Sequence, residues 1–126
     1  MPTAQKSVMI IEDEPDAAEL FAEMMRLNGY RVLKSYSGSP AMALIAQQRP
    51  DVIILDLMMP EVSGLDVLRM LRRDPSLASI PVVIVSAKAT ADDIRIGMEA
   101  GASIYLTKPV AYIDLKNAVD SLANVP

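Results

Sequence analysis

A run of four apolar residues, Val52-Ile53-Ile54-Leu55, ends at the carboxylate of Asp56, and Met59-Pro60 follows closely. Short uninterrupted apolar runs are typical of strands buried on both faces of a parallel sheet. Pro60 has no N–H to donate to a strand ladder, so the strand must stop before it. Asp56 is therefore predicted at the carboxyl edge of a sheet, where open α/β folds bind their ligands.

Runs of this kind recur along the chain. Strands are predicted at residues 8–11, 30–35, 52–56, 82–86 and 104–107. Four of them are short and apolar, as in a parallel sheet covered on both faces. In the second run, Arg31 and Lys34 indicate an edge position.

Helical patterns fill the gaps between these strands. The first helix is expected at residues 15–27 and is ended by Asn28-Gly29. The second is expected to begin with Ser39 as its N-cap and Pro40 as its first helical residue. Thr90 is the expected N-cap of the fourth. The fourth helix is predicted from its cap alone. The apolar residues expected to be buried on the other four helices are Ala17, Leu20, Phe21, Met24 and Met25 on the first; Ala41, Leu44 and Ile45 on the second; Leu65, Leu68 and Leu71 on the third; and Leu115, Ala118, Val119 and Leu122 on the fifth.

Strict alternation of strand and helix predicts a doubly wound α/β fold with a five-stranded parallel sheet and right-handed crossovers. No linker, repeat or low-complexity segment interrupts the 126 residues, so we expect one domain over residues 1–126. That domain would either stand alone or form part of a longer protein. All five carboxyl ends of the strands would then meet at one rim.

Composition excludes several classes of function. The chain has no Cys and no His, which rules out disulfides, thiolate chemistry, imidazole bases and His/Cys zinc sites. The net charge of −4 argues against direct binding to nucleic acid or to an anionic membrane surface. No apolar run has the length of a signal-peptide core or a membrane span, so we expect a soluble cytoplasmic protein.

Chemically interesting groups follow three further strands besides the one that ends at Asp56. Glu12-Asp13-Glu14 follows the first strand, Ser86 ends the fourth, and Lys108 follows the fifth. Crowded carboxylates repel one another unless a cation lies between them. Mg²⁺ suits such oxygen ligands, and Mn²⁺ is a possible substitute. A metal site, a carboxylate nucleophile, a hydroxyl and an ammonium together indicate phosphoryl transfer to Asp56.

These motifs together resemble the receiver domain of two-component response regulators over essentially the whole chain. Residues 56–64 resemble the D-x-x-M-P-x-x-x-G signature of that family. Glu12-Asp13 is similar to its acidic pair, Ser86-Ala87 to its hydroxyl-plus-small step, and Lys108-Pro109 to its Lys-Pro. The resemblance implies the flavodoxin-like strand order 2-1-3-4-5.

The resemblance also assigns the metal and phosphoryl sites. Asp56 would accept a phosphoryl group from the phosphohistidine of a sensor histidine kinase or a phosphotransfer protein. Asp13, Asp56 and the backbone carbonyl of Met58 would ligate Mg²⁺, and Glu12 would act through water. The domain would catalyse only its own phosphorylation and dephosphorylation.

Similarity to this family further implies a switch. Lys108 would pair with the phosphoryl group, and the Lys108–Pro109 bond would be cis. Ser86 would move toward the phosphate, and Tyr105 would turn inward behind it. A changed surface on the fourth helix, fifth strand and fifth helix would then bind an output domain or protein.

Other functions are left open by the residues. An aspartyl phosphatase or mutase resembles D-x-D, but Met58 stands where the second acid is needed. A flavin or nucleotide binder needs a phosphate loop after the first strand, where Glu12-Asp13-Glu14 would repel anions. The main alternative is a receiver-like interaction module that works without phosphorylation. The chain departs from the family in having Glu-Asp rather than Asp-Asp and Ser rather than Thr.

Overall fold

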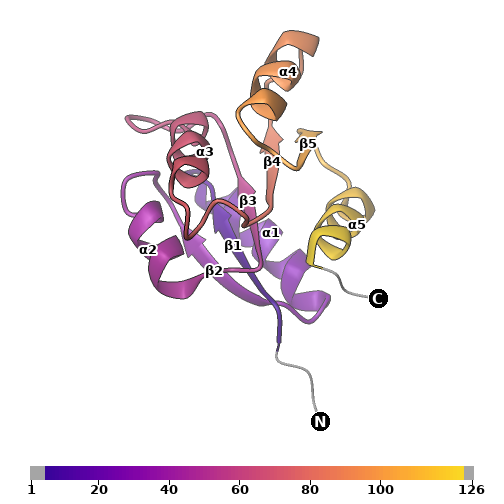
Figure 1. Ribbon diagram of the computed structural model, residues 1–126. Coiled ribbons are helices and arrows are strands. Elements are labelled where there is room, and N and C mark those ends of the chain that lie inside the picture. Colours follow the sequence, from indigo (N-terminus) through magenta and orange to yellow (C-terminus); the bar gives the residue numbers. More distant parts are fainter. Residues whose placement is uncertain (1–4, 124–126) are drawn as a thin grey trace.

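The computed structural model describes residues 5–123 of the 126-residue chain (Figure 1). Its strands are β1 (Ser7–Ile11), β2 (Arg31–Ser35), β3 (Val52–Leu55), β4 (Val82–Ser86) and β5 (Ile104–Thr107). Its helices are α1 (Pro15–Leu27), α2 (Ala41–Gln48), α3 (Gly64–Arg73), α4 (Ala91–Glu99) and α5 (Tyr112–Ala123). Among these residues, no helix combines the length and apolar character needed to cross a membrane.

The five strands are parallel and lie in the order β2-β1-β3-β4-β5. This confirms the predicted doubly wound α/β fold. β1 and β3 are neighbours, with Ile11 opposite Leu55, so the acidic residues that follow the two strands meet at the same edge. β4 and β5 run in register to Ser86 opposite Thr107, which brings the ends of these strands together as well.

The two edge strands differ from the central ones in burial. β2 lies at an edge, as its charged residues predicted. β5 forms the other edge and packs against both layers, but it is covered less completely than expected. Ile104, Tyr105 and Leu106 are half-buried, and Thr107 is exposed. An apolar run therefore does not by itself separate a central strand from an edge strand that has one neighbour.

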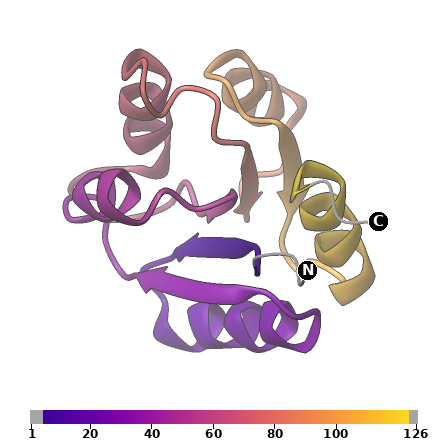
Figure 2. The same ribbon diagram turned by 60° about the horizontal axis from the view of Figure 1, so that its bottom comes forward.

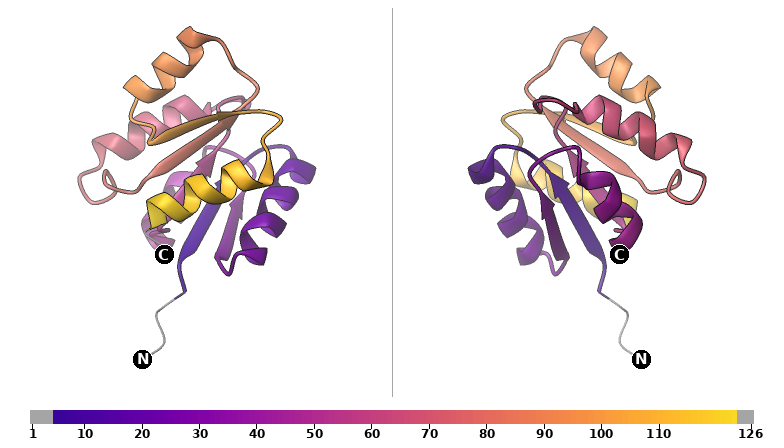
Figure 3. Two further views of the ribbon diagram at one scale, coloured as in Figure 1. Left: turned by 90° about the vertical axis from the view of Figure 1, so that its right-hand side faces the viewer. Right: turned by 90° about the vertical axis from the view of Figure 1, so that its left-hand side faces the viewer.

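Helices cover both faces of the sheet, with α1 and α5 on one face and α2, α3 and α4 on the other (Figure 2). In the left view of Figure 3, β5 runs between α4 and α5. Alternate residues of each strand divide between the two layers, since successive strand side chains point to opposite faces. Val8 and Ile10 pack in the α1–α5 layer, whereas Met9 and Ile11 pack in the other.

Two helix details differ from the sequence prediction. α2 begins at Ala41, and Pro40 occupies the N-cap position with helical backbone angles, so Ser39 does not cap the helix. In α1, Leu20 is 54% exposed, although it was expected to be buried. The buried face of α1 contains Ala18 and Ala22, because small residues at this spacing let the helix lie close to the sheet.

The other helix starts follow simple capping chemistry. Ser63 Oγ accepts a hydrogen bond from the Asp66 N–H at 3.2 Å and caps α3. Thr90 Oγ1 accepts from the Asp93 N–H at 3.1 Å, and Asp93 Oδ2 accepts from the Thr90 N–H at 3.3 Å. This reciprocal pair is a capping box, which confirms Thr90 as the N-cap of α4.

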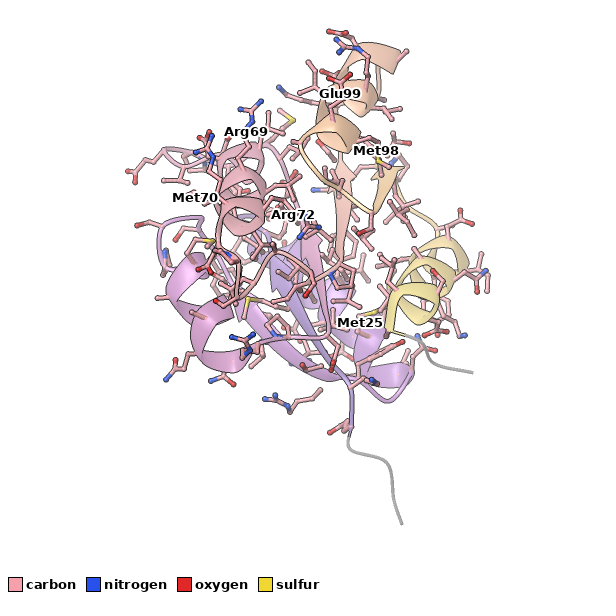
Figure 4. All side chains as sticks on the ribbon, in the orientation of Figure 1. Met25, Arg69, Met70, Arg72, Met98 and Glu99 are labelled. Atoms are coloured by element: carbon pink, nitrogen blue, oxygen red, sulfur yellow. The ribbon has the colours of Figure 1, made fainter. Side chains whose placement is uncertain are left out.

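Arg72, on the inner side of α3, joins three segments of backbone (Figure 4). Its Nη1 donates to the carbonyls of Ala78 at 3.0 Å and Ile80 at 2.7 Å, both in the loop before β4. Its Nε donates to the Gly101 carbonyl, just after α4, at 3.0 Å. Burial lowers the pKa of the Arg72 guanidinium. The contact holds the end of α4 against α3.

A second polar contact joins parts of the chain that are 90 residues apart. The buried Tyr30 hydroxyl, just before β2, donates to Asp120 Oδ1 on α5. Lys116 Nζ donates to the other Asp120 oxygen at 2.7 Å. Burial and the Asp120 carboxylate raise the pKa of the Tyr30 phenol well above its ordinary value. The bond therefore anchors α5 to the segment between α1 and β2.

Replacing Tyr30 by Phe should lower the free energy of unfolding by about 1–2 kcal/mol, because a buried hydrogen bond to a charged acceptor is lost. Denaturant unfolding at neutral pH measures this. The advantage of wild type over Y30F should hold below about pH 10 and decline above it, since the phenol then ionises only in the unfolded chain.

Tyr112→Phe is the matched control. The Tyr112 hydroxyl donates to Asn28 Oδ1 at 2.9 Å in an exposed position. Its loss should cost less than about 0.5 kcal/mol. Equal losses for the two variants would show that the Asp120 contact adds nothing particular to stability.

Candidate functional site

Asp56 lies directly after β3, and its side chain is 6% exposed. Its N–H donates to the Ile11 carbonyl at 3.0 Å, which extends the pairing of β3 with β1 by one residue. Oδ1 accepts a hydrogen bond from the Met58 N–H at 3.1 Å, whereas the Met58 side chain is exposed. The Asp56 carboxylate is therefore held by its own loop at the rim of the sheet.

Two acidic residues from the β1 end face Asp56. Glu12 is buried and Asp13 is half-buried, and one carboxylate oxygen from each lies within 4.8 Å of an oxygen of Asp56 and of the other. Burial is the main reason that the pKa of Glu12 is raised, and the Asp56 carboxylate adds to the effect. Three carboxylates at this separation form a site of strongly negative potential.

Lys108 supplies the positive charge of this site from the loop after β5. Its Nζ is 2.6 Å from Glu12 Oε1 and 3.6 Å from Asp56 Oδ2. Burial alone would lower the pKa of the Lys108 ammonium, but the two carboxylates outweigh burial and raise it. The Lys108–Pro109 peptide bond is cis.

Ser86, at the end of β4, is fully buried. Its carbonyl accepts from the Lys108 N–H at 2.9 Å, and its Oγ accepts from the Lys88 N–H at 3.2 Å. Tyr105, on β5, donates its hydroxyl to the Lys88 carbonyl at 2.7 Å. The backbone N–H and carbonyl of Lys88 thus connect the Ser86 hydroxyl to the Tyr105 hydroxyl.

The sequence model of the response regulator receiver domain matches residues 8–120, which include every residue of this site. The chain belongs to this family. Receiver domains of response regulators are signalling proteins of two-component systems, and phosphorylation and Mg²⁺ are typical of them. The function predicted at the level of the family is confirmed.

Relatives and solved structures agree with this assignment. The polar-differentiation response regulator DivK of Brucella anthropi is 38% identical over 106 residues, covering 84% of this chain and 86% of DivK. The DNA-binding response regulator MtrA of Mycolicibacterium smegmatis is 35% identical over 109 residues, covering 86% of this chain but 46% of MtrA. The chain thus spans less than half the length of MtrA.

The solved receiver domain of the Francisella response regulator 1452 superimposes with a TM-score of 0.89 at 29% identity, covering 95% of this chain and 98% of that domain. The similarity extends over nearly the whole fold, including the strand order that brings the site together.

The receiver domain has a donor set that fits Mg²⁺. Glu12, Asp13 and Asp56 present hard carboxylate oxygens close to one another, and a divalent cation would offset their mutual repulsion. Thiolate and imidazole donors are absent from the whole sequence, so the chemistry of the site favours a hard ion.

The sequence predicted that these residues meet at one rim, but it did not predict one of their contacts. Glu12 was expected to act on the metal through water, and Lys108 on the phosphoryl group. The structure pairs Glu12 with Lys108 across 96 positions of sequence. No local pattern predicts which carboxylate a lysine will choose. The longer side chain of Glu, compared with Asp, is the only signal in the sequence.

Gly64 is the last residue of the 56–64 signature, and the structure of this receiver domain explains why the position holds a glycine. A Cβ at this position would lie 2.0 Å from the Asp56 carbonyl oxygen and 2.7 Å from Leu57 Cα. The Gly64 N–H donates to the Leu57 carbonyl at 3.1 Å. The start of α3 therefore packs directly on the backbone that carries Asp56.

Gly64→Ala should destabilise the domain by more than about 3 kcal/mol, because the contacting atoms are backbone and cannot move aside. Gly29→Ala is the control: its Cβ would meet nothing within 4 Å, but its φ of +85° is unfavourable for Ala. That variant should lose about 1 kcal/mol. Denaturant unfolding compares them, and equal losses would contradict the packing argument.

Proposed function

We propose that this receiver domain accepts a phosphoryl group on Asp56 in the presence of Mg²⁺. The observation that carries the proposal is the placement of the Asp56 carboxylate at the rim of the sheet, 3.6 Å from the Lys108 ammonium and beside two further carboxylates. An oxygen of Asp56 would form a bond to phosphorus while the phosphorus–nitrogen bond of a phosphohistidine breaks. The imidazole would leave on the donor protein.

Asp13 and Asp56 would hold the metal directly with the Met58 carbonyl, and Glu12 would act through water. Mn²⁺ has the same preference for oxygen ligands and would substitute. When bound, the ion supplies positive charge that offsets the charge of the transferring oxygens. The loop contact between the Met58 N–H and Asp56 Oδ1 would orient the carboxylate for both tasks.

Lys108 would exchange partners during phosphorylation. At present its ammonium lies 2.6 Å from Glu12 and 3.6 Å from Asp56. A phosphoryl group on Asp56 would bring new anionic oxygens to this ammonium. Because Lys108 is fixed through its backbone to the Ser86 carbonyl, its side chain can turn from one carboxylate to the other while the backbone stays.

Ser86 and Tyr105 would transmit the effect of phosphorylation from the site to the surface of the domain. The Ser86 hydroxyl would donate to a phosphoryl oxygen, and Tyr105 would follow through Lys88. The receiving surface would be that of α4, β5 and α5. A hollow on this surface is lined by Ile94 of α4, Tyr105 and Leu106 of β5, and Asp114 of α5. An output domain or protein would bind there, without direct contact of this domain with nucleic acid.

The phosphohistidine donor would dock beside the site on α1. An apolar groove there is lined by Ala17, Leu20 and Phe21 of α1 and by Pro109 and Val110 after Lys108. Leu20 is 54% exposed in this groove. A helix of a sensor kinase or phosphotransfer protein that covers this groove would bring its phosphohistidine to the same rim as Asp56. Such a partner would place the domain in the cytoplasm.

Asp56→Asn tests the phosphoacceptor. Wild type incubated with acetyl phosphate and Mg²⁺ should gain one phosphoryl group by intact mass, and D56N should gain none, since an amide is not a comparable nucleophile. Asp66→Asn, at an exposed position on α3, is the control and should still be labelled. Labelling of D56N at the wild-type level would place the phosphoryl group elsewhere. An unlabelled wild type that also fails to bind Mg²⁺ would favour the interaction module that works without phosphorylation.

Leu20→Asp tests the docking groove. Phosphotransfer from a histidine-phosphorylated kinase domain that labels wild type should slow by at least about tenfold, because a carboxylate would be desolvated in an apolar interface. Labelling by acetyl phosphate, which needs no docking, should stay the same. Leu27→Asp is the control on the same helix, where the side chain is 79% exposed and outside the groove. Equal slowing in both variants would remove the groove from the docking site.

A further inference from the structure

Gly97 lies in the last turn of α4, two residues before its end, and glycine is among the least favourable residues for a helix. It is the one residue of α4 that is buried. A Cβ built at this position would lie 2.9 Å from both Cδ2 and Cε2 of Tyr105 and 3.0 Å from Ile84 Cδ1. Contacts this short are essentially absent for real Cβ atoms. The missing side chain therefore makes room for the Tyr105 ring.

The other side of this ring is tied to the site. Its hydroxyl donates to the Lys88 carbonyl at 2.7 Å, and the Lys88 N–H donates to Ser86 Oγ at 3.2 Å. Each step joins groups in direct contact, from Gly97 to Tyr105, from Tyr105 to Lys88 and from Lys88 to Ser86. A displacement of the ring from α4 would release the Lys88 carbonyl and loosen the backbone whose N–H donates to Ser86 Oγ.

The end of α4 is tied to α3 shortly after Gly97. Arg72 donates to the Gly101 carbonyl at 3.0 Å and holds the end of α4, four positions after Gly97. Met98 and Glu99, beside Gly97, extend away from the core (Figure 4). An added methyl group at position 97 would therefore move the ring of Tyr105 more readily than it moves α4.

We propose that Gly97 is a positioning residue for Ser86. Its missing side chain leaves space for the Tyr105 ring. From this position the Tyr105 hydroxyl holds the Lys88 carbonyl, and the Lys88 N–H in turn holds the Ser86 hydroxyl. This inference rests on the proposed role of Ser86 at the phosphoryl site. Because Ser86 Oγ accepts from the Lys88 N–H, its own hydrogen remains available to donate to a phosphoryl oxygen. The seated ring thus favours the arrangement that receives the phosphoryl group.

A thermal-unfolding cycle tests whether Gly97 makes room for the ring. In the wild-type background Gly97→Ala should lower the melting temperature, because the methyl group meets the ring. In a Tyr105→Ala background the same substitution should raise it, because the ring is gone, the Ile84 methyl group can turn into the vacated space, and the better helix propensity of Ala remains. A change of the melting temperature in the same direction in both backgrounds would show that Gly97 does not make room for the Tyr105 ring.

A ligand titration tests the connection to Ser86. Beryllofluoride with Mg²⁺, a mimic of the phosphoryl group, should bind G97A at least about fivefold more weakly than wild type, as measured by NMR titration. In the Y105A background, Gly97→Ala should cause no further weakening. Exchange of the Lys88 amide hydrogen should be faster in G97A than in wild type. Met98→Ala, the neighbouring exposed position, is the control and should keep wild-type affinity.

The outcomes separate this inference from the proposed function. Gly97→Ala could change the melting temperature in opposite directions in the two backgrounds and yet leave the affinity for beryllofluoride unchanged. That result would overturn the connection to Ser86 and leave the proposed role of Asp56 as phosphoacceptor standing. No binding of beryllofluoride by wild type would overturn the proposed function and the connection to Ser86 together. The thermal cycle would still decide whether Gly97 seats the ring.

Discussion

The burial of the Glu12 and Asp56 carboxylates around one ammonium, that of Lys108, is the constraint on which the rest of the site depends. Buried charges must be paired or must bind a cation. The strand order satisfies this requirement by placing β1 beside β3 and by carrying Lys108 to the same rim at the end of β5. Three carboxylates with one ammonium leave a site short of positive charge, and this shortage is what makes it suited to a divalent ion.

The fold could be predicted from the sequence because its signals are local and repeated. Apolar runs and capping residues placed every strand and helix within a few positions, and Arg31 and Lys34 identified the edge strand β2. The candidate site could be predicted for a related reason. In a parallel sheet all carboxyl ends meet, so residues that follow strands are brought together whatever their distance in the chain. The strand order itself came from the resemblance to receiver domains and not from the pattern.

The parts that sequence could not supply are choices between partners. Lys108 lies close to two carboxylates, and its shorter contact is with Glu12, which the periodicity of the sequence does not indicate. The orientation of α1 depends on Ala18 and Ala22, which a search for large apolar residues undervalues, and this left Leu20 at the surface. β5 has the composition of a central strand but only one neighbour. In each case the deciding interaction is between distant segments.

The Tyr30–Asp120 bond has a consequence for how the chain can fold. The layer that covers one face of the sheet is built from α1 and α5, the first and last helices of this domain, and this bond joins the residue before β2 to α5. During synthesis on a ribosome, α1 and its side of the sheet must wait with apolar surface uncovered until the last helix has emerged. Folding of that layer is therefore non-local, and completion of the domain is coupled to completion of the chain segment that ends with α5.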